Sequence, residues 1–563
     1  MNFPISLAEK VRELAREHPG DPAFIVDGRV LDWAGYDAAA DRLARVFLAL
    51  GLEPGERVAV WVPDGTPFHI AYQAAERCGL VCLGLAPRCG ERELAHLLTL
   101  ASARTLVSAP EMPDGPAAKR VARLRERGIR IEHHLILSGD GFADDAIELD
   151  GRAAPSTADD ATDVAPGAIA APPGRRALAR RLESRGLKAG DVSLLNTTSG
   201  TTGLPKIVIH DQLRWFHYHD LAVEVGRLDE RDVFMSSLPA PVGFGLWTAH
   251  FTPTLLGAPT VLTRKFDARA TIEALERHRV TVLAAVSTQF IMLLESGGFD
   301  GGRKLALRAL FTGGEAVPER QARNFELRTG ASVLQFYGSN ETGAVSATRP
   351  DDPPHKRLTT AGKPIPSMQL RLFDGEGRDV TASGRGQPAV KGPVVSQGYL
   401  GAPEANAQLI TADGWVKLGD LVELDADGYL RVIGRTDDII IRGGKNLSAA
   451  AIEEGVALHP SVALAAAIGM PDRIFGERAA AYVELRAGAS LELDGLRAHL
   501  QGEGIARELW PEALVVLPEL PRGIGGKVAK GELRDDARKR FGDASDEDLI
   551  ARARAAERAD DSA

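Results

Sequence analysis

The chain has 563 residues, enough for more than one domain and a large core. Its composition, 44% hydrophobic and 26% charged, is typical of a soluble globular protein, and a formal net charge of −10 argues against bulk nucleic-acid binding, which needs a basic face. No apolar run is long enough to span a bilayer, and the first residues, MNFPISLAEKV, lack the segments of a secretory signal, so we expect a cytoplasmic protein.

Strands and helices alternate from about residue 30 to 140. The hydrophobic pattern predicts, in chain order, a strand over 57–62, a helix over 68–77, a strand over 81–86, a helix over 91–100 and a strand over 105–108. Strands separated by helices imply right-handed crossovers and mainly parallel sheets that helices cover on both faces. The pattern therefore predicts an α/β fold.

The three cysteines lie in this first part of the chain, at Cys78, Cys82 and Cys89. Their number is odd, they form no Cys-x-x-Cys pair, and so few thiols in a long chain indicate a reducing compartment. We expect small packed hydrophobic side chains here and neither metal nor redox chemistry.

The segment over 139–174 is predicted to be a loose surface connection, because it is rich in Ala, Asp, Gly and Pro and poor in large apolar residues. A basic helix over 175–185 with a solvated face follows it. The alternation then resumes with strands over 192–195, 260–262, 280–286, 307–311 and 332–336 and a helix over 268–278. Ligands in such sheets bind at the carboxyl ends of the strands.

A domain boundary is predicted near Gly434, after a strand over 428–433. It divides the chain into a large domain over 1–433 and a smaller α+β domain over 434–563, of normal domain size. We expect short strands and a helix over 493–501 in the smaller domain, and a charged, Ala-rich surface tail over 541–563.

The segment from Asn196 to His210, NTTSGTTGLPKIVIH, is rich in groups that bind anions. Glycines let backbone N–H groups turn toward an anion, hydroxyl groups add donors, and Lys206 supplies a positive charge. The Walker-type spacing is absent, because Pro205 follows the four residues after Gly200. A flexible linker is the alternative, but linkers rarely end in Pro-Lys before a β-branched strand. We therefore expect a loop that wraps a polyphosphate.

The run from Thr198 to Lys206 resembles, without a gap, the phosphate loop of the AMP-forming adenylating enzymes. This superfamily includes acyl-CoA synthetases, aryl-CoA ligases, peptide-synthetase adenylation domains and firefly-type luciferases. The resemblance extends over roughly residues 31–533 and implies ATP, Mg²⁺ and coenzyme A as cofactors and a mobile C-terminal domain. It implies that the β- and γ-phosphates are held by Thr198, Ser199, Gly200, Thr201, Thr202, Gly203 and Lys206.

Two further segments resemble nucleotide-binding parts of this family. Gly313-Gly314-Glu315 resembles the adenine-contacting turn, although alone it would be read as an ordinary turn. The segment from Gln335 to Gly343 resembles the Tyr-Gly-x-Thr-Glu motif, which implies that Tyr337 lies near adenine and that Glu341 is an oxygen ligand of Mg²⁺. Asn340 stands where the family has a threonine that contacts the α-phosphate, and its amide can donate a hydrogen bond.

The segment from Trp415 to Asp420 resembles the ribose-binding segment of the family, with Leu418 in place of a threonine. The carboxylate of Asp420 suits the two ribose hydroxyl groups. The resemblance further implies that Arg435 contacts the ribose and that Asp437 is the hinge between the domains.

Two segments of the smaller domain complete the resemblance. The segment from Arg442 to Ser448 resembles the part of the family that meets the pantetheine, which implies this role for Gly443 and Gly444, although Ala449 and Ala451 replace the usual Pro and Glu. The run from Leu520 to Leu533 is similar to the C-terminal motif that carries the catalytic lysine. Lys527 would then bridge the carboxylate and the α-phosphate, with Lys530 and Lys206 as less suitable substitutes.

The acid site is expected to be mainly apolar. No acidic residue lies between Leu238 and Gly257 to pair an α-ammonium group, which argues against an amino-acid substrate. An aromatic or alicyclic carboxylic acid fits best, a short or medium fatty acid comes next, and Thr288 or Gln289 could bond a ring hydroxyl. The expected pocket residues are Val242, Phe244, Trp247, Thr288, Gly313, Phe336 and Gly338.

Three questions stay open. A chain without carrier or condensation modules favours CoA as the acyl acceptor, and the pantetheine of a carrier protein is the alternative. The alternative to an enzyme is a nucleotide-binding protein that has lost catalysis. It is motivated by Asn340, Leu418 and Ala449, which depart from the family motifs. Whether the chain forms a homodimer is also left open.

Overall fold

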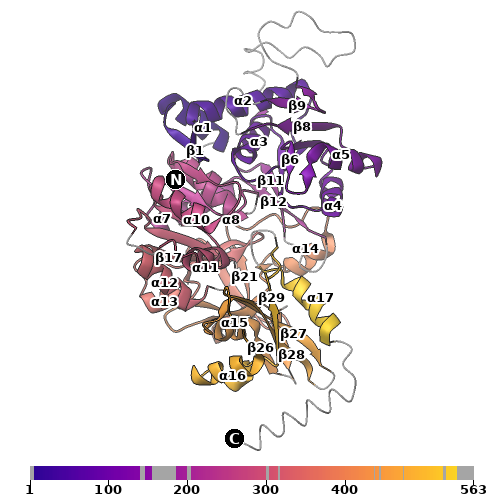
Figure 1. Cartoon of the computed structure of the whole chain (residues 1–563). Coiled ribbons are helices and arrows are strands. Elements are labelled where there is room, and N and C mark those ends of the chain that lie inside the picture. Colours follow the sequence, from indigo (N-terminus) through magenta and orange to yellow (C-terminus); the bar gives the residue numbers. More distant parts are fainter. Residues whose placement is uncertain are drawn as a thin grey trace, which may run out of the picture. The chain divides into compact units, whose positions relative to one another are not determined.

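The computed structural model of the chain describes residues 6–139, 146–154, 185–198, 204–241, 243–299, 303–314, 317–435, 438–442, 445–472, 475–523 and 528–541. These residues form two compact units. The first contains the described chain up to Leu418 together with Leu424–Arg431, and the second contains Gly419–Glu423, Val432–Gly523 and 528–541. Figure 1 shows the elements of both.

A nine-stranded sheet forms one half of the first unit. Its order is β19 (Lys363–Pro364), β18 (Gly343–Ala347), β17 (Ser332–Ser339), β16 (Ala309–Gly313), β15 (Val282–Ala284), β13 (Phe234–Ser236), β14 (Thr260–Leu262), β1 (Pro22–Val26) and β2 (Arg29–Asp32). The strands from β17 to β1 are parallel, and β2, β18 and β19 add antiparallel edges. The parallel centre explains the nearly continuous apolar strands, since both faces are buried.

An eight-stranded sheet forms the other half. Its order is β10 (Arg152–Ala153), β9 (Ile147–Leu149), β8 (His133–Leu137), β5 (Thr105–Ser108), β3 (Arg57–Trp61), β4 (Val81–Leu85), β11 (Val192–Thr197) and β12 (Ile207–Asp211). The strands from β8 to β11 are parallel, whereas β9, β10 and β12 are antiparallel. The expectation of mainly parallel sheets covered by helices is thus confirmed.

The helices of this unit follow the expected rules of capping and burial. Asp32 and Asp267 accept hydrogen bonds from Gly35 N (2.7 Å) and Ala270 N (2.9 Å), and so begin α2 and α10. The helices are α1 (Leu7–Glu17), α2 (Trp33–Ala49), α3 (Thr66–Arg77), α4 (Glu91–Ala101), α5 (Ala117–Glu126), α7 (Leu213–Gly226), α8 (Gly243–Leu246), the π-helix Trp247–Phe251, α9 (Thr252–Leu256), α10 (Ala268–Arg277), α11 (Ser287–Glu295), α12 (Glu319–Thr329), α13 (Pro354–Thr359) and α14 (Pro403–Leu409). No helix of the described residues is both long and apolar enough to cross a membrane.

Shorter strands complete this part of the chain. β20 (Gln369–Phe373), β21 (Arg385–Lys391) and β22 (Val416–Lys417) are antiparallel neighbours, and β6 (Glu111–Met112) pairs with β7 (Gly115–Pro116). β23 (Asp420–Leu424) and β24 (Leu430–Arg435) follow β22 along the chain.

The segment predicted to be loose over 139–174 is ordered in part. Its described residues 146–154 contain β9 and β10, and β9 pairs with β8 at Leu135↔Leu149 and Leu137↔Ile147. The alternating Ile147 and Leu149 pack against the core, which the low apolar content of the whole segment concealed. The remainder over 155–174 and most of the predicted basic helix lie outside the described residues.

The second unit is built on the sheet β26 (Lys445–Ser448), β25 (Ile439–Arg442), β28 (Gly476–Leu485) and β27 (Val462–Asp472), with β29 (Ala513–Leu517) parallel to β28. Its helices are α15 (Ala449–Ala457), α16 (Leu493–Gly502) and α17 (Lys530–Phe541), with a 3₁₀ turn at Arg507–Leu509 (Figure 1). Alternate residues of β28 enter two separate cores, Ala481 and Val483 one and Ala480 and Tyr482 the other. Both faces of this sheet are therefore buried.

The expectation of only short strands here was wrong, since β27 has 11 residues and β28 has 10. The domain boundary at Gly434 stays a prediction, and the predicted tail beyond Phe541 lies outside the described residues.

The cysteines behave as packed side chains. All three thiols are buried and free, and burial raises the pKa of Cys78 and of Cys89 to about 12. The described residues contain no group of three or more His, Cys, Asp or Glu side chains that could hold a metal ion.

Several imidazoles are buried in neutral form. Nδ1 of His69 lies 2.8 Å from Nδ1 of His250, and neither ring is exposed. Burial lowers the pKa of His69 to about 3 and that of His134 and His219 to about 4, and it also lowers the pKa of His210 and His250 well below the usual value. Because the unfolded chain protonates these rings near pH 6.5, it binds more protons than the folded protein below that pH. Stability is therefore present above about pH 6.5 and is lost as the pH falls.

Replacing His219 with methionine is expected to reduce this loss of stability. Nδ1 of His219 is buried and has no hydrogen-bond partner among the described residues, so the substitution breaks no bond of that atom. Between pH 7.5 and 5.5 the free energy of unfolding should fall by about 1.4 kcal/mol less than in the wild type. Urea unfolding at the two pH values measures this free energy, and Leu221→Met in the same helix is the control. An unchanged difference between the two pH values would show that His219 takes up its proton as readily in the folded protein as in the unfolded chain.

Candidate functional site

The base of the predicted phosphate loop is a β-hairpin. β11 pairs antiparallel with β12 up to Thr197↔Ile207, and the Thr198 N–H donates to Lys206 O (3.0 Å). The Lys206 N–H in turn donates to Thr198 Oγ1 (3.1 Å), and His96 Nε2 lies 3.2 Å from Pro205 O. The two ends of the loop are thus held together, while Ser199, Gly200, Thr201, Thr202 and Gly203 lie outside the described residues.

Tyr399 connects Lys206 to Glu341. Lys206 Nζ lies 5.0 Å from the centre of the Tyr399 ring, a cation–π contact, and the Tyr399 hydroxyl donates to Glu341 Oε1 (2.8 Å). Tyr399 is held against β12, because the Leu400 N–H donates to Ile207 O (2.8 Å). The base of the loop and the predicted metal ligand therefore lie on one contact chain within the first unit.

Glu341 is carried by a tight turn after β17. The Ser339 N–H donates to Thr342 Oγ1 (3.0 Å), and the Glu341 N–H donates to Ser339 Oγ (3.2 Å). The Ser396 N–H donates to Glu341 O (2.7 Å) and ties the turn to the segment before Tyr399. The Glu341 carboxylate is thereby held at a defined place next to the loop.

Asn340 lies beside the expected acid site. A Cβ on Gly243 would lie 2.8 Å from Asn340 Oδ1 and 3.8 Å from Asn196 Nδ2, so a larger side chain there would displace the Asn340 amide. Asn340 Oδ1 and both amide atoms of the fully buried Asn196 have no hydrogen-bond partner among the described residues. Buried amides normally find partners, so these atoms are available to a ligand or water.

A buried arginine lies behind the same turn. Arg214, in the first turn of α7, is 2% exposed and donates from Nη1 to Asn340 O (3.0 Å). Nη1 also contacts His210 Nδ1, which must accept, so the imidazole proton is on Nε2. Burial lowers the pKa of Arg214 to about 10, and it therefore keeps its charge at neutral pH.

Aromatic rings form the floor of the expected acid site. Trp247 stacks on Phe244 (5.4 Å, 21°) and on Phe311 (5.7 Å, 28°), and Phe336 meets it edge-on (5.1 Å, 66°). Phe244 is only half-buried, whereas Trp247 and Phe336 are buried. Three of the expected pocket residues, Phe244, Trp247 and Phe336, thus pack together, and Val242 lies outside the described residues.

Glycines permit the close approach of the strands beside these rings. A Cβ on Gly313, at the end of β16, would lie 2.1 Å from Phe336 O, and one on Gly338 would lie 1.8 Å from Gly343 O. Gly314 follows with a φ of +78°, in the left-handed region that favours glycine. Tyr337 lies in β17 between Phe336 and Gly338.

Thr288 and Gln289 begin α11, and both are buried. The Gln289 amide is used internally, because Nε2 donates to Ser237 O (2.6 Å) and Oε1 accepts from Val286 N (3.1 Å). The same side chain therefore fixes the start of α11 against the segment after β13.

The second unit carries the remaining predicted residues. Asp420 begins β23, and Arg435 ends β24. Arg522 pairs with Val528 in an isolated antiparallel bridge, and the Ala529 N–H donates to Pro521 O (2.7 Å), so the chain on either side of the predicted catalytic lysine is tied together. The residues Glu315, Asp437, Gly443, Gly444 and Lys527 themselves lie outside the described residues.

Sequence reasoning did not select Tyr399, Arg214 or Asn196. Tyr399 lies in a loop without a motif, and neither an arginine near a helix start nor an asparagine near a strand end signals its burial by residue type. Only their contacts bring them to the turn that carries Asn340 and Glu341.

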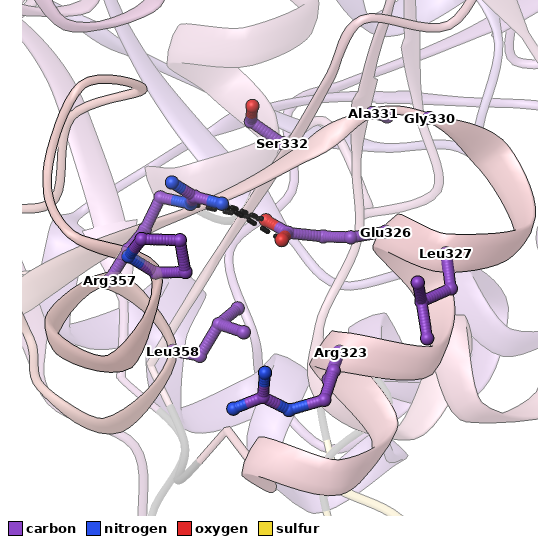
Figure 2. Close-up of a pocket in the computed structure, with 9 residues that line it drawn as sticks. Arg323, Glu326, Leu327, Gly330, Ala331, Ser332, Arg357 and Leu358 are labelled. Carbon is purple, nitrogen blue, oxygen red and sulfur yellow. Dashed lines mark hydrogen bonds and ion pairs between the residues drawn. The ribbon is translucent and has the colours of Figure 1, made fainter.

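A cavity of about 320 Å³ lies elsewhere, between α12 and α13, and contains none of the predicted residues. Figure 2 shows Arg357 directed at Glu326 across this cavity, with Arg357 Nη2 at 2.9 and 2.8 Å from the two carboxylate oxygens. Arg357 and Glu326 therefore neutralise each other, and Arg323, which also lines the cavity, pairs with Glu319.

The residues present fit Mg²⁺ in one respect. Glu341 offers a carboxylate, the kind of oxygen ligand that this hard cation prefers. Nucleotide phosphates and water are the other oxygen ligands that Mg²⁺ commonly takes in such sites.

Comparison with known proteins identifies the family of the chain. The family model described as "AMP-binding enzyme" matches residues 11–400, and that of the "AMP-binding enzyme C-terminal domain" matches residues 451–527. The chain is 30% identical to a medium-chain fatty-acid–CoA ligase of Escherichia coli (strain K12), over 95% of this chain and 91% of that protein. It is 32% identical to a salicylyl-CoA synthase / salicylate adenylyltransferase of a Streptomyces species, over 92% of this chain and 91% of that protein.

A solved structure of another CoA ligase shares this fold. The crystal structure of an anthranilate CoA ligase in complex with anthranoyl-AMP matches 95% of this chain and 98% of its own, with a TM-score of 0.79 at 20% identity. With the sequence matches covering most of the chain and the Lys206–Tyr399–Glu341 contacts joining the loop to the turn, the chain belongs to the AMP-binding enzyme family and is an adenylate-forming ligase.

Proposed function

We propose that this protein is an ATP-dependent carboxylic acid–CoA ligase whose substrate is an aromatic or alicyclic acid. In the first step a carboxylate oxygen of the acid attacks the α-phosphorus of ATP, the α–β phosphoanhydride bond breaks and pyrophosphate leaves. In the second step the thiol sulfur of CoA attacks the acyl carbon and releases AMP. The contact chain from Lys206 through Tyr399 to Glu341 carries this proposal, because it sets a cation and a carboxylate beside a hydroxyl-rich loop.

Each part of the chain has a proposed role. Thr198, Lys206 and the loop between them hold the β- and γ-phosphates, and Asn340 donates to the α-phosphate. Glu341 holds Mg²⁺, which when bound neutralises phosphate charge. Lys527 bridges the reacting anions, Asp420 and Arg435 bind ribose, and Gly314, Glu315 and Tyr337 contact adenine.

The small unit is proposed to change its orientation between the steps. Rotation about Asp437 would present Lys527 for adenylate formation and Gly443 and Gly444 for thioester formation. This assignment rests on the resemblance, since these four residues lie outside the described part of the chain.

The choice of an aromatic acid rests on the stacked rings. Phe244, which is half-buried, stacks on the buried Trp247 next to Phe336, so the ring cluster is apolar, and no acidic side chain of the 238–257 segment is present to pair an ammonium group. Relatives named for aromatic acids include the salicylyl-CoA synthase and a 2-hydroxy-7-methoxy-5-methyl-1-naphthoate–CoA ligase of Streptomyces carzinostaticus, 31% identical over 94% of this chain. The E. coli medium-chain ligase supports a fatty acid as the second candidate.

ATP–pyrophosphate exchange across a panel of acids tests the first step. Exchange is expected with benzoate-like or alicyclic acids and to be at least about tenfold weaker with octanoate, since a flat wall favours a rigid ring. The best acid is then offered CoA or a phosphopantetheinylated carrier protein. If the carrier protein is the better substrate, the acyl acceptor is the carrier and not CoA. If no acid supports exchange, the result favours a nucleotide-binding protein without catalysis.

A further inference from the structure

The buried arginine of α7 has an unusual electrostatic environment. Arg214 is 2% exposed, and no described carboxylate lies within ion-pair distance of it, although the charges of Asp211 and Glu341 act on it from farther away. Its polar partners are a backbone carbonyl, Asn340 O, and a neutral imidazole, His210, while its guanidinium lies over the Trp215 ring at 5.0 Å. A buried cation that lacks a carboxylate is costly, and such charges are usually paired.

The position on the helix increases this cost. Arg214 lies in the first turn of the 14-residue helix α7, whose Gln212 cap makes no side-chain hydrogen bond. The amino end of a helix carries partial positive charge and favours anions. Asp211 Oδ1 accepts from the Arg214 backbone N–H (3.1 Å), so this carboxylate serves the helix end and does not form an ion pair with the guanidinium.

The Arg214 charge lies directly behind the turn that carries Asn340 and Glu341. Arg214 Nη1 bonds the carbonyl of Asn340, whose side chain reaches toward Gly243, and Glu341 is the next residue. A cation in a low-dielectric interior acts over several ångströms and is weakly screened by salt. With no carboxylate in direct contact with it, this cation would attract the phosphate of a bound nucleotide.

We propose that Arg214 is a positioning residue that holds the Asn340–Glu341 turn and contributes a fixed positive potential to the phosphate site, without touching the nucleotide. This inference rests on the proposed function and extends it to a residue outside the motifs. It predicts that Arg214 discriminates between ligands by their charge, which a merely structural arginine would not do.

The test compares the affinities of AMP and adenosine by calorimetry in the full-length protein. Arg214→Met, which keeps the length and loses the charge, should weaken AMP binding roughly tenfold to a hundredfold, as expected for one unit charge several ångströms away at an effective dielectric constant of about 20. Adenosine affinity should change less than about twofold, and Arg214→Lys should keep most of the preference for AMP. Arg214→Gln is measured in the same way in case the methionine variant does not fold.

Arg120 provides a matched control. It also lies over a tryptophan ring, 5.1 Å from Trp61, and donates to a carbonyl, Cys89 O (3.1 Å), but it pairs with Asp114. Arg120→Met should leave the ratio of the two affinities unchanged. If the neutral Arg214 variants lose affinity for AMP and adenosine equally, or lose none, the inference about Arg214 is overturned but the proposed function is not. A wild-type protein that binds AMP no more tightly than adenosine would overturn it together with the proposed function.

Discussion

Replacing Lys527 with alanine is expected to lower the rate of acyl-adenylate formation by at least about a hundredfold. When the carboxylate of the acid approaches the α-phosphate, two anions must come together, and a positioned ammonium group offsets their repulsion in the transition state. Pyrophosphate release from acid and ATP measures this step. Thioester formation from preformed acyl-adenylate and CoA should remain largely intact, because it no longer joins two anions.

Lys530 is the matched control for this variant. Its ammonium group lies 2.7 Å from Glu453 Oε1 and 3.3 Å from Asp438 Oδ2, so it is committed to ion pairs within the second unit. Lys530→Ala should cost roughly 1–3 kcal/mol of stability and leave adenylate formation near the wild-type rate. If Lys527→Ala slowed both half-reactions equally, or if Lys530→Ala abolished adenylate formation, the assigned role of Lys527 would be lost.

The fold was largely predictable because the parallel sheets leave a strong pattern. β3, β4, β5 and the helices α3 and α4 begin and end within about two residues of the expected positions, since apolar runs alternate with amphipathic helices. The long β27–β28 hairpin was not predictable, because runs such as Ala465-Ala466-Ala467 favour helix by propensity. Burial on both faces of the sheet, which only the tertiary structure shows, overrides that preference.

Only the site residues that lie in family motifs could be predicted from the sequence. Thr198, Lys206 and Glu341 stand in recognisable segments, and the structure brings the last two into contact through Tyr399. Tyr399 and Arg214 come from segments without a signature, and their importance depends on burial and long-range contacts that no local pattern encodes. The same limit applies to Asn196, whose fully buried amide resembles an ordinary strand-end residue in the sequence.

Replacing Glu341 with glutamine should lower adenylate formation roughly a hundredfold at a fixed low Mg²⁺ concentration. Glutamine keeps the shape and can still accept the Tyr399 hydroxyl at Oε1, which now lies 2.8 Å away, but it removes the negative charge that suits a hard cation. The Mg²⁺ concentration for half-maximal rate should therefore rise, and higher Mg²⁺ should restore part of the activity.

Tyr399→Phe separates charge from position in this pair. It removes the hydrogen bond to Glu341 but keeps the ring that lies 5.0 Å from Lys206 Nζ, so the rate should fall less than about tenfold with little change in the Mg²⁺ requirement. A titration of adenylate formation against Mg²⁺ for both variants distinguishes the two effects. An unchanged Mg²⁺ requirement in Glu341→Gln would mean that this carboxylate orients the turn and that the cation is held by other groups.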